Sequence, residues 1–260
     1  AQPSLSQQII KLEKELGHPL LDRLGRQAQL TEAGKVLYDQ AVTILAAVDE
    51  AKRRVLESDD SEMGQISIGA IPTIAPYLLP PLGRRFAQRF PRAQVTVHED
   101  LTEHTIQGCL EGKLDVGILA LPVEHTNLAV EPLFTEELLL VTAANHTLAK
   151  KKRVTMDDVA KEPFVLLSQM HCLGEQVVSF CRQKECLPAV TCESAQLLTV
   201  QEFVASGHGV SLIPEMAAAA DKDKRRKHRS LSGSKPSRTV AIVWHKHRYQ
   251  SPLVATFMYF

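Results

Sequence analysis

The apolar residues at the start of the chain recur at helical spacing. Within residues 3–17 they form one stripe with steps of 4, 3 and 4, which predicts an amphipathic helix. The stripe consists of Leu5, Ile9, Leu12 and Leu16. Pro3 suits the first turn, where a missing N–H costs nothing, and Gly17 ends the helix. Residues 18–30 are rich in turn formers and predict a small hairpin.

A longer apolar repeat follows the hairpin. Thr31 suits a helix cap and Glu32 its first turn, and the apolar residues then keep a period of about 3.5 over nearly three heptads. They are Leu37, Ala41, Ile44, Val48, Ala51 and Val55. This period is typical of a helix that pairs with another helix, whereas a surface helix packed on its own domain is the alternative. The acidic residues 57–64 predict a linker.

From Gly64 onward, strand patterns alternate with helical ones. The strand patterns lie at 65–71, 93–100, 114–121, 137–144, 163–168, 189–194, 209–216 and 239–246. Helical patterns separate many of them, and Pro80 and Pro81 predict a break or kink in the first, at 72–90. Alternation of this kind implies a parallel sheet with helices on its faces. We therefore expect an α/β fold with two small subdomains joined by crossing strands.

The composition narrows the class of protein. The chain has 260 residues, 44% of them hydrophobic, with 30 basic residues balancing 30 acidic ones, which suits a soluble protein. No apolar run is long enough for a membrane span. Five cysteines without a secreted framework favour the reduced cytoplasm. The basic run at 221–230 is typical of a solvated loop, with nucleic-acid contact as the alternative.

Two cysteines carry the candidate chemistry. Cys172 follows a strand, stands directly after His171 at a helix start, and precedes Cys181 by nine positions. The helix dipole at such a position favours a thiolate. Buried thiols, metal ligands and a redox pair are all open readings, although the cysteine spacings lack the C-x₂₋₄-C pair of a zinc site. We expect no metal and no cofactor.

Polar residues at other strand ends are expected to converge on Cys172, because ligands of open α/β sheets bind beyond the carboxyl ends of the strands. Those residues are Thr73, Thr102 and Ser194. A helix cap is the commoner role of each one taken singly.

The segment QPSLSQQIIKLEKELGHPLLDRLGRQAQLTEAG resembles the winged helix-turn-helix signature of LysR-type transcriptional regulators. The resemblance implies a partial DNA-binding domain at 1–30, a linker dimerisation helix at 31–63 and an effector domain at 64–260. That effector domain would have two periplasmic-binding-protein-like halves, subdomain I at about 64–133 and 210–260 and subdomain II at about 134–209. The family's first helices would precede Ala1, so we expect a fragment.

Four further segments, IPTIAPYLLP, GKLD, MHCLGEQVVSFC and RTVAIVW, are similar to the OxyR-type peroxide sensors of this family. This resemblance implies redox roles for Cys172 and Cys181. It implies a peroxide or effector site formed by His171, Thr73, Thr102, Glu175, Ser194 and Arg238. It implies DNA contacts by Gln2, Pro3, Ser4, Ser6, Arg23 and Arg26.

Helix geometry bears on a bond between the two redox cysteines. Nine positions of one helix span roughly 13 Å and leave Cys172 and Cys181 on opposite faces, whereas a disulfide needs Cα atoms about 4.4–6.8 Å apart. The bond would therefore form only if part of the helix melts, as a switch does. Cys186 is an alternative resolving thiol.

The function that this resemblance implies is a DNA-binding regulator, not an enzyme, that activates antioxidant genes when peroxide oxidises Cys172. Its expected partners are promoter DNA for the full-length parent protein, hydrogen peroxide, RNA polymerase and further copies in a homodimer or homotetramer. The alternative is a LysR-type regulator that binds a small metabolite between its subdomains, with incidental cysteines. A solute-binding protein and a thiol peroxidase are weaker competitors.

Overall fold

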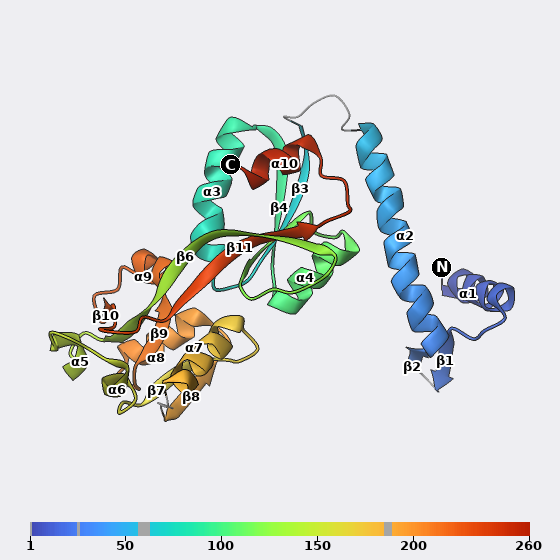
Figure 1. Cartoon of the computed structure of the whole chain (residues 1–260). Coiled ribbons are helices and arrows are strands. Elements are labelled where there is room, and N and C mark those ends of the chain that lie inside the picture. The colour runs from blue at the N-terminus through green and yellow to red at the C-terminus, as the bar shows by residue number, and fades with distance from the viewer. Residues whose placement is uncertain (1, 25–26, 57–62, 185–188) are drawn as a thin grey trace. The chain divides into compact units, whose positions relative to one another are not determined.

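A computed structural model describes residues 2–24, 27–56, 63–184 and 189–260, and the chain divides into two compact units, residues 1–58 and 59–260 (Figure 1). The first unit contains two helices and a hairpin between them. Its elements are α1 (Gln2–Leu16), β1 (Leu21–Leu24), β2 (Gln27–Leu30) and α2 (Glu32–Leu56). The expected first helix, hairpin and long helix are confirmed.

Short polar links hold the hairpin to both helices. The Thr31 hydroxyl accepts the Gly34 N–H at 3.0 Å as a cap of α2, and it donates to the Pro19 carbonyl at 2.7 Å. The Glu13 carboxylate accepts the Leu20 N–H at 2.8 Å. Helix α2 nevertheless exposes apolar side chains of the heptad repeat, with Ile44 61% exposed. Pairing of this helix with another therefore stays a prediction.

The second unit mixes helices and strands. Its strands are β3 (Met63–Ala70), β4 (Arg92–Glu99), β5 (Val116–Ala120), β6 (Leu128–Ala143), β7 (Phe164–Leu167), β8 (Val190–Ser194), β9 (Ser211–Pro214), β10 (Arg226–Arg229) and β11 (Ser237–His245). Its helices are α3 (Ala75–Arg89), α4 (Thr102–Glu111), α5 (Thr147–Lys150), α6 (Met156–Val159), α7 (Cys172–Gln183), α8 (Leu197–Ala205), α9 (Glu215–Ala220) and α10 (Pro252–Met258).

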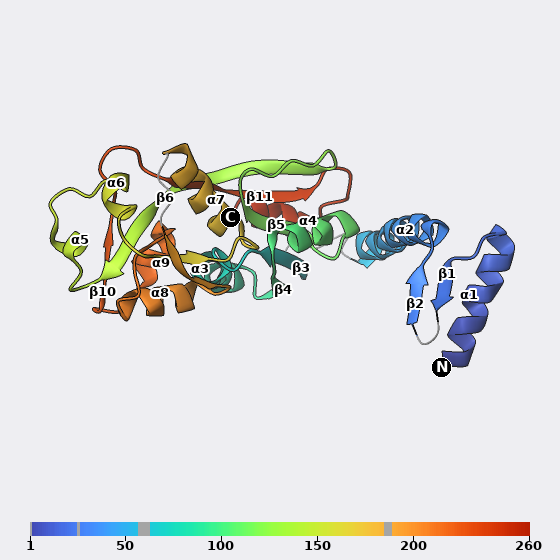
Figure 2. The same cartoon turned by 90° about the horizontal axis from the view of Figure 1, so that it is seen from below.

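Two long strands carry the sheet from one subdomain into the other (Figures 1 and 2). The strand order is β10–β6–β11–β5–β3–β4, and β9 also pairs with β6. Strand β3 is parallel to β4 and β5, whereas β11 is antiparallel to both β5 and β6. Strand β6 pairs with β11 along its first half and with β9 and β10 along its second. The expected crossing strands are therefore β6 and β11.

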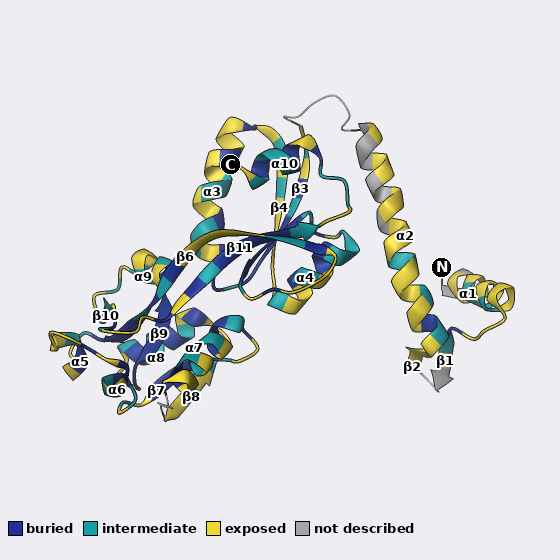
Figure 3. Ribbon diagram, viewed as in Figure 1, coloured by how far each residue is buried: buried dark blue, intermediate teal, exposed yellow. Residues whose placement is uncertain are grey.

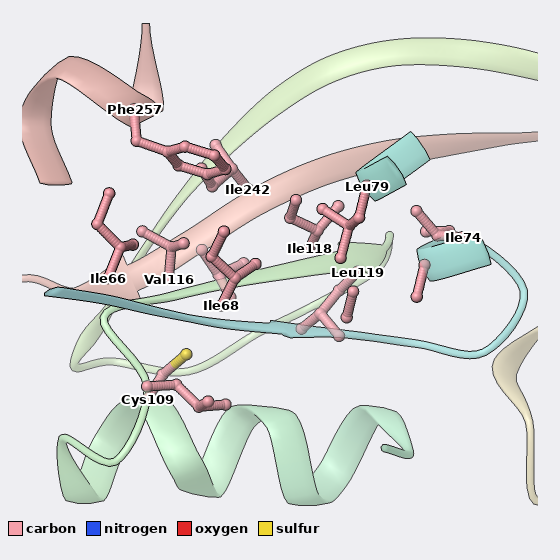
Figure 4. Packing of buried hydrophobic residues seen from close by; sticks show 14 of the residues in the cluster. Ile66, Ile68, Ile74, Leu79, Cys109, Val116, Ile118, Leu119, Ile242 and Phe257 are labelled. Atoms are coloured by element: carbon pink, nitrogen blue, oxygen red, sulfur yellow. The ribbon is translucent and has the colours of Figure 1, made fainter. Parts of the chain in front are cut away.

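Each subdomain has its own cluster of buried apolar residues. Figure 3 colours the ribbon by burial and shows buried segments in both subdomains. The first core gathers residues of β3, α3, α4, β5, β11 and α10, among them Ile66, Ile118, Ile242 and Phe257 (Figure 4). The second core gathers residues of 138–231, among them Leu140, Phe164, Val177 and Leu212.

Two expectations about this unit differ from the structure. Residues 210–231, expected in subdomain I, supply Val210, Leu212 and Leu231 to the second core, because β9 and β10 pair with the far half of β6. A break or kink was expected at Pro80 and Pro81, and the break is wrong, because α3 continues through both. Both prolines are exposed while the opposite face packs inward, so tertiary burial outweighs the lost backbone hydrogen bonds.

The basic run at 221–230 is structured and paired. Arg226 is buried and binds Asp221 at 2.6 Å and Glu202 at 2.7 Å. Arg225 pairs with Glu202 and Asp223. Residues 226–229 form β10, which lies against β6. The second half of the run is thus a strand with an ion-pair network rather than the expected solvated loop, while 221–225 form neither helix nor strand. The two adjacent arginines, Arg225 and Arg226, already have acidic partners.

Candidate functional site

Cys172 begins helix α7, directly beyond the end of strand β7. The His171 carbonyl accepts the Gly174 N–H at 2.9 Å and so starts the helix. Gly174 permits a close approach: a Cβ there would lie 2.3 Å from the Leu167 carbonyl oxygen and 2.6 Å from that of Ser168. The missing side chain thereby lets α7 begin on the strand end, which fixes the position of Cys172.

Cys172 lines a cleft of about 1150 Å³ between α4, β5, α7 and β11, here called the Cys172 cleft. Four of the residues expected at the site line it together. They are Thr102, Cys172, Glu175 and Arg238. The structure thus brings residues from positions 102 to 238 to one cavity.

Burial raises the pKa of the Cys172 thiol, and the Glu175 carboxylate acts in the same direction. The Thr102 hydroxyl and the Arg238 guanidinium lower it, but by less in total. We expected the helix start to favour the thiolate; the net shift is opposite because desolvation of a buried sulfur outweighs these stabilising groups. The thiol is therefore mostly protonated at neutral pH.

The Thr102 hydroxyl is the most direct polar neighbour of the thiol. It is buried, and its Oγ1 has no hydrogen-bond partner among the described residues, although it favours the thiolate as a hydrogen-bond donor would. The hydroxyl therefore lies near enough to the sulfur to influence its pKa. A buried hydroxyl without a partner costs free energy, so this position favours a polar ligand.

Three other expected site residues do not line the cleft as described. Thr73 is buried and acts through Arg238, whose Nη1 donates to the Thr73 hydroxyl at 2.8 Å. His171 is buried at the start of α7, and its side chain makes no capping hydrogen bond. The Ser194 hydroxyl accepts the Gln196 N–H at 3.3 Å in the turn before α8. Ser194 therefore ends strand β8, and its hydroxyl serves the turn that follows.

Sequence reasoning missed Gln176 and Glu136. Gln176 lines the cleft, donates from Nε2 to the Leu121 carbonyl at 2.8 Å, and has a buried Oε1 without a described partner. Its position four residues after Cys172 places it on the same helix face, so helical spacing was the available signal. Glu136 binds Arg238, which lies 102 positions later in the chain. No local sequence pattern predicts such a pair.

The other described cysteines differ from Cys172 in their surroundings. Cys181 is 1% exposed and packs in the second core, whereas Cys172 packs against the first. Burial raises the pKa of Cys109 to about 12. Cys192 is half-buried, and Cys186 lies outside the described residues. Cys172 is thus the one that lines the cleft among the described cysteines.

The expected DNA-contacting residues lie on the first unit. The backbone of Gln2, Pro3 and Ser4 forms the first turn of α1, and their side chains lie outside the described part. Ser6 is exposed on α1. Arg23 lies in β1, and its side chain is likewise not described. Arg26 lies outside the described residues, so these contacts stay predictions.

Within the described ranges, no group of three or more histidine, cysteine or acidic side chains could hold a metal ion. None of the helices in those ranges is both long and apolar enough to cross a bilayer.

Comparison with known protein families and curated proteins places the chain among bacterial regulators. The model of the LysR substrate binding domain matches residues 59–260, and that of the bacterial regulatory helix-turn-helix protein, lysR family, matches 1–35. The chain is 37% identical to the DNA-binding transcriptional dual regulator OxyR of Escherichia coli over 97% of its length and 82% of that protein. It is 35% identical to the hydrogen peroxide-inducible genes activator of Pectobacterium carotovorum, over 97% and 83%.

Solved structures agree with the sequence relatives. A full-length OxyR from Pseudomonas aeruginosa with one cysteine replaced by aspartate gives a TM-score of 0.80 at 28% identity, covering 99% of this chain and 84% of that one. An H₂O₂-bound cysteine-to-serine OxyR from Corynebacterium glutamicum gives 0.73 at 28%, covering 100% and 82%. The chain therefore belongs to the LysR family of bacterial transcriptional regulators, in the group that contains the hydrogen peroxide-inducible genes activators.

Proposed function

We propose that this chain is the sensing part of a DNA-binding regulator that detects hydrogen peroxide through Cys172. The observation that carries the proposal is the Cys172 cleft, in which a cysteine at a helix start faces a buried Thr102 hydroxyl without a described partner and the Arg238 guanidinium. The names of the curated relatives support it.

The chemistry starts from the minor fraction of Cys172 that has lost its proton to water, because the thiolate is the form that attacks peroxide. The Cys172 thiolate attacks one oxygen of hydrogen peroxide, the O–O bond breaks, and the departing hydroxide takes a proton to become water. The sulfur is oxidised to a sulfenic acid as the peroxide accepts two electrons. Thr102 and Arg238 would hold the peroxide and stabilise the departing oxygen, because both present donors where negative charge develops.

A second thiol then converts the sulfenic acid into a disulfide. The Cys181 thiolate attacks the sulfenic sulfur of Cys172, and hydroxide leaves as water. Helix α7 runs unbroken from Cys172 to Gln183, so the nine positions span roughly 13 Å, about twice the separation that a disulfide allows. Cys181 must also leave the second core. The bond therefore requires that α7 unwinds, which turns oxidation into a conformational signal.

The first unit would carry the signal to DNA in the full-length parent. Helix α1 and the hairpin have the arrangement of a recognition helix and wing, and Gln2, Pro3 and Ser4 lie at the helix end that reads base edges. The exposed apolar stripe of α2 supports pairing of two copies. We infer a cytoplasmic homodimer or homotetramer that contacts RNA polymerase at antioxidant promoters.

Hydrogen exchange tests the proposal directly. Peroxide treatment should speed exchange across residues 172–183 in the wild type, and peptide mapping should identify the Cys172 bond, with Cys186 as the rival of Cys181. A Cys172→Ser variant should show neither change, whereas a Cys192→Ser control should show both. Equal exchange in reduced and oxidised wild-type protein would contradict the unwinding.

The size of the cleft favours a second candidate function. A volume of about 1150 Å³ far exceeds what one peroxide molecule fills and lies just above the range of about 300–1,000 Å³ that is usual for small-molecule sites. In that case the regulator would respond to a metabolite bound between the subdomains. Full induction of target genes by peroxide-free cell extract in a Cys172→Ser strain would support this alternative.

A further inference from the structure

A buried ion pair lies behind the Cys172 cleft. The Arg238 Nε donates to Glu136 Oε1 at 2.8 Å, and the two side chains are 0% and 5% exposed. Arg238 comes from β11 and Glu136 from β6, the two strands that cross between the subdomains. Removing one partner of a buried ion pair costs much folding free energy, because the charge that remains is buried without water or a counter-ion.

Both oxygens of Glu136 are in use. While Oε1 accepts from Arg238, Oε2 accepts the Met216 N–H at 2.9 Å. Met216 lies in the first turn of α9, a helix that contributes Ala217 to the second core. The carboxylate therefore links the guanidinium to a helix of the second core.

Arg238 is also tied to the first subdomain. Its Nη1 donates to the Thr73 hydroxyl at 2.8 Å and its Nη2 to the Thr73 carbonyl at 2.9 Å. A guanidinium has five N–H groups, so two are left once these three bonds are made. Arg238 lines the Cys172 cleft, and its positive charge lowers the pKa of the Cys172 thiol, so its guanidinium lies close enough to act on that sulfur.

We propose that Glu136 is a positioning residue for the reaction of Cys172 with peroxide: it fixes the Arg238 guanidinium at the cleft and ties it to helix α9. The inference rests on the proposed function, since it concerns the same cysteine. Glu136 itself does not line the cleft as described, so it acts through Arg238. The charged and hydroxyl groups that face the thiol are Arg238 from β11, Glu175 from α7 and Thr102 from α4.

The substitution Glu136→Gln tests this role, because glutamine has one carbonyl oxygen where two acceptors are needed. Its NH₂ group would meet either the Arg238 Nε–H or the Met216 N–H, and Arg238 would lose its counter-charge. Thiolate formation at Cys172 should then become easier, since the positive charge is no longer balanced. Reaction with peroxide should nevertheless suffer, because the donors are displaced.

Two rates for Cys172, each followed by peptide mapping, separate these effects. Alkylation by iodoacetamide reports only the thiolate, whereas oxidation by hydrogen peroxide also needs the placed donors. In Glu136→Gln we expect the pH profile of alkylation to shift to lower pH. We expect the ratio of the oxidation rate to the alkylation rate to fall about tenfold or more.

The neighbouring residue provides the matched control. Glu137 lies next along β6, and its carboxylate binds Ser230 and Lys235 instead. Glu137→Gln removes the same charge without touching Arg238, and it should leave both the ratio and the pH profile unchanged. An equal fall in Glu137→Gln would overturn the proposal, since a general loss of negative charge would explain it.

A second pair of variants answers the question if Glu136→Gln does not fold. The double variant Glu136→Gln with Arg238→Met removes both charges of the buried pair, which favours folding, and Arg238→Met alone keeps the Glu136 carboxylate for comparison. The ratio should fall in Arg238→Met and should fall no further in the double variant. A further fall, or an unchanged ratio in Arg238→Met, would overturn the role assigned to Glu136.

The outcomes distinguish this inference from the function on which it rests. If peroxide fails to oxidise Cys172 in the wild type, the proposed function is wrong whatever the variants do. If the wild type reacts and folded Glu136→Gln keeps the wild-type ratio, Glu136 is not a positioning residue and the proposed function stands.

Discussion

Gly174 offers a sharp test of how α7 positions Cys172. Replacing it with alanine would place a Cβ 2.3 Å from the Leu167 carbonyl oxygen, whereas real contacts of this kind essentially never fall below 3.0 Å. The helix start must therefore move by the difference, about 0.7 Å, and both close contacts, with Leu167 and Ser168, are to backbone atoms that cannot rotate away.

The magnitude follows from two opposing effects. Alanine in a helix is ordinarily better than glycine by about 0.5–1 kcal/mol, but forcing an extra carbon into a packed site costs about 1–3 kcal/mol. We expect Gly174→Ala to lower the free energy of unfolding by about 1–2 kcal/mol. Since Cys172 lies two residues away, the rate of its oxidation should fall about tenfold or more.

Urea unfolding and the rate of peroxide oxidation measure the two effects. Gly83→Ala is the matched control, because Gly83 lies within helix α3 and nothing lies within 4 Å of a Cβ built there. That control should gain about 0.5–1 kcal/mol and react at the wild-type rate. If Gly174→Ala were as stable and as reactive as the wild type, the close approach of α7 to β7 would not position the cysteine.

Two further outcomes are expected. Glu175→Gln should speed alkylation of Cys172 at pH 7.5 about twofold to threefold, because the carboxylate that raises the thiol pKa is gone. Cys109, with a pKa of about 12, should stay unlabelled in the same experiment. An unchanged alkylation rate would show that Glu175 is too well solvated to affect the thiol. If two copies pair through α2 as proposed, Ile44→Glu should give monomers in analytical ultracentrifugation of the full-length protein, because it would bury a charge in that helix pair. A dimer retained by the variant would place the interface elsewhere.

Sequence reasoning succeeded where one short segment carries the information. The stripe of residues 3–17 and the heptad repeat after Thr31 predicted helices that the structure confirms as α1 and α2, because helical periodicity is visible along consecutive residues. The same holds for Cys172 at the junction of β7 and α7. Sequence reasoning failed at Pro80 and Pro81, where burial of the opposite helix face outweighed the tendency of proline to break a helix.

The candidate site was only partly predictable, because local patterns do not show which distant segments of the chain meet. Thr102 and Glu175 stand beside strand or helix ends and were expected at the cleft. Ser194 stands at such an end too, yet it forms a local turn. Residues 210–231 were assigned to the wrong side because strand pairing with β6, and not order along the chain, decides which core they join.

By itself, the sequence determined the helices of the first unit, the alternation of strands and helices after Gly64, and the nine-residue spacing of Cys172 and Cys181. That spacing implies that a helix must unwind before the two cysteines meet. These depend on neighbouring residues and fixed helix geometry. Only the tertiary structure decided that burial raises the pKa of Cys172, and that Arg238 meets Thr73 across 165 positions and Glu136 across 102. Desolvation and ion pairing depend on which distant segments enclose a side chain, and those segments meet when the crossing strands β6 and β11 join the two subdomains.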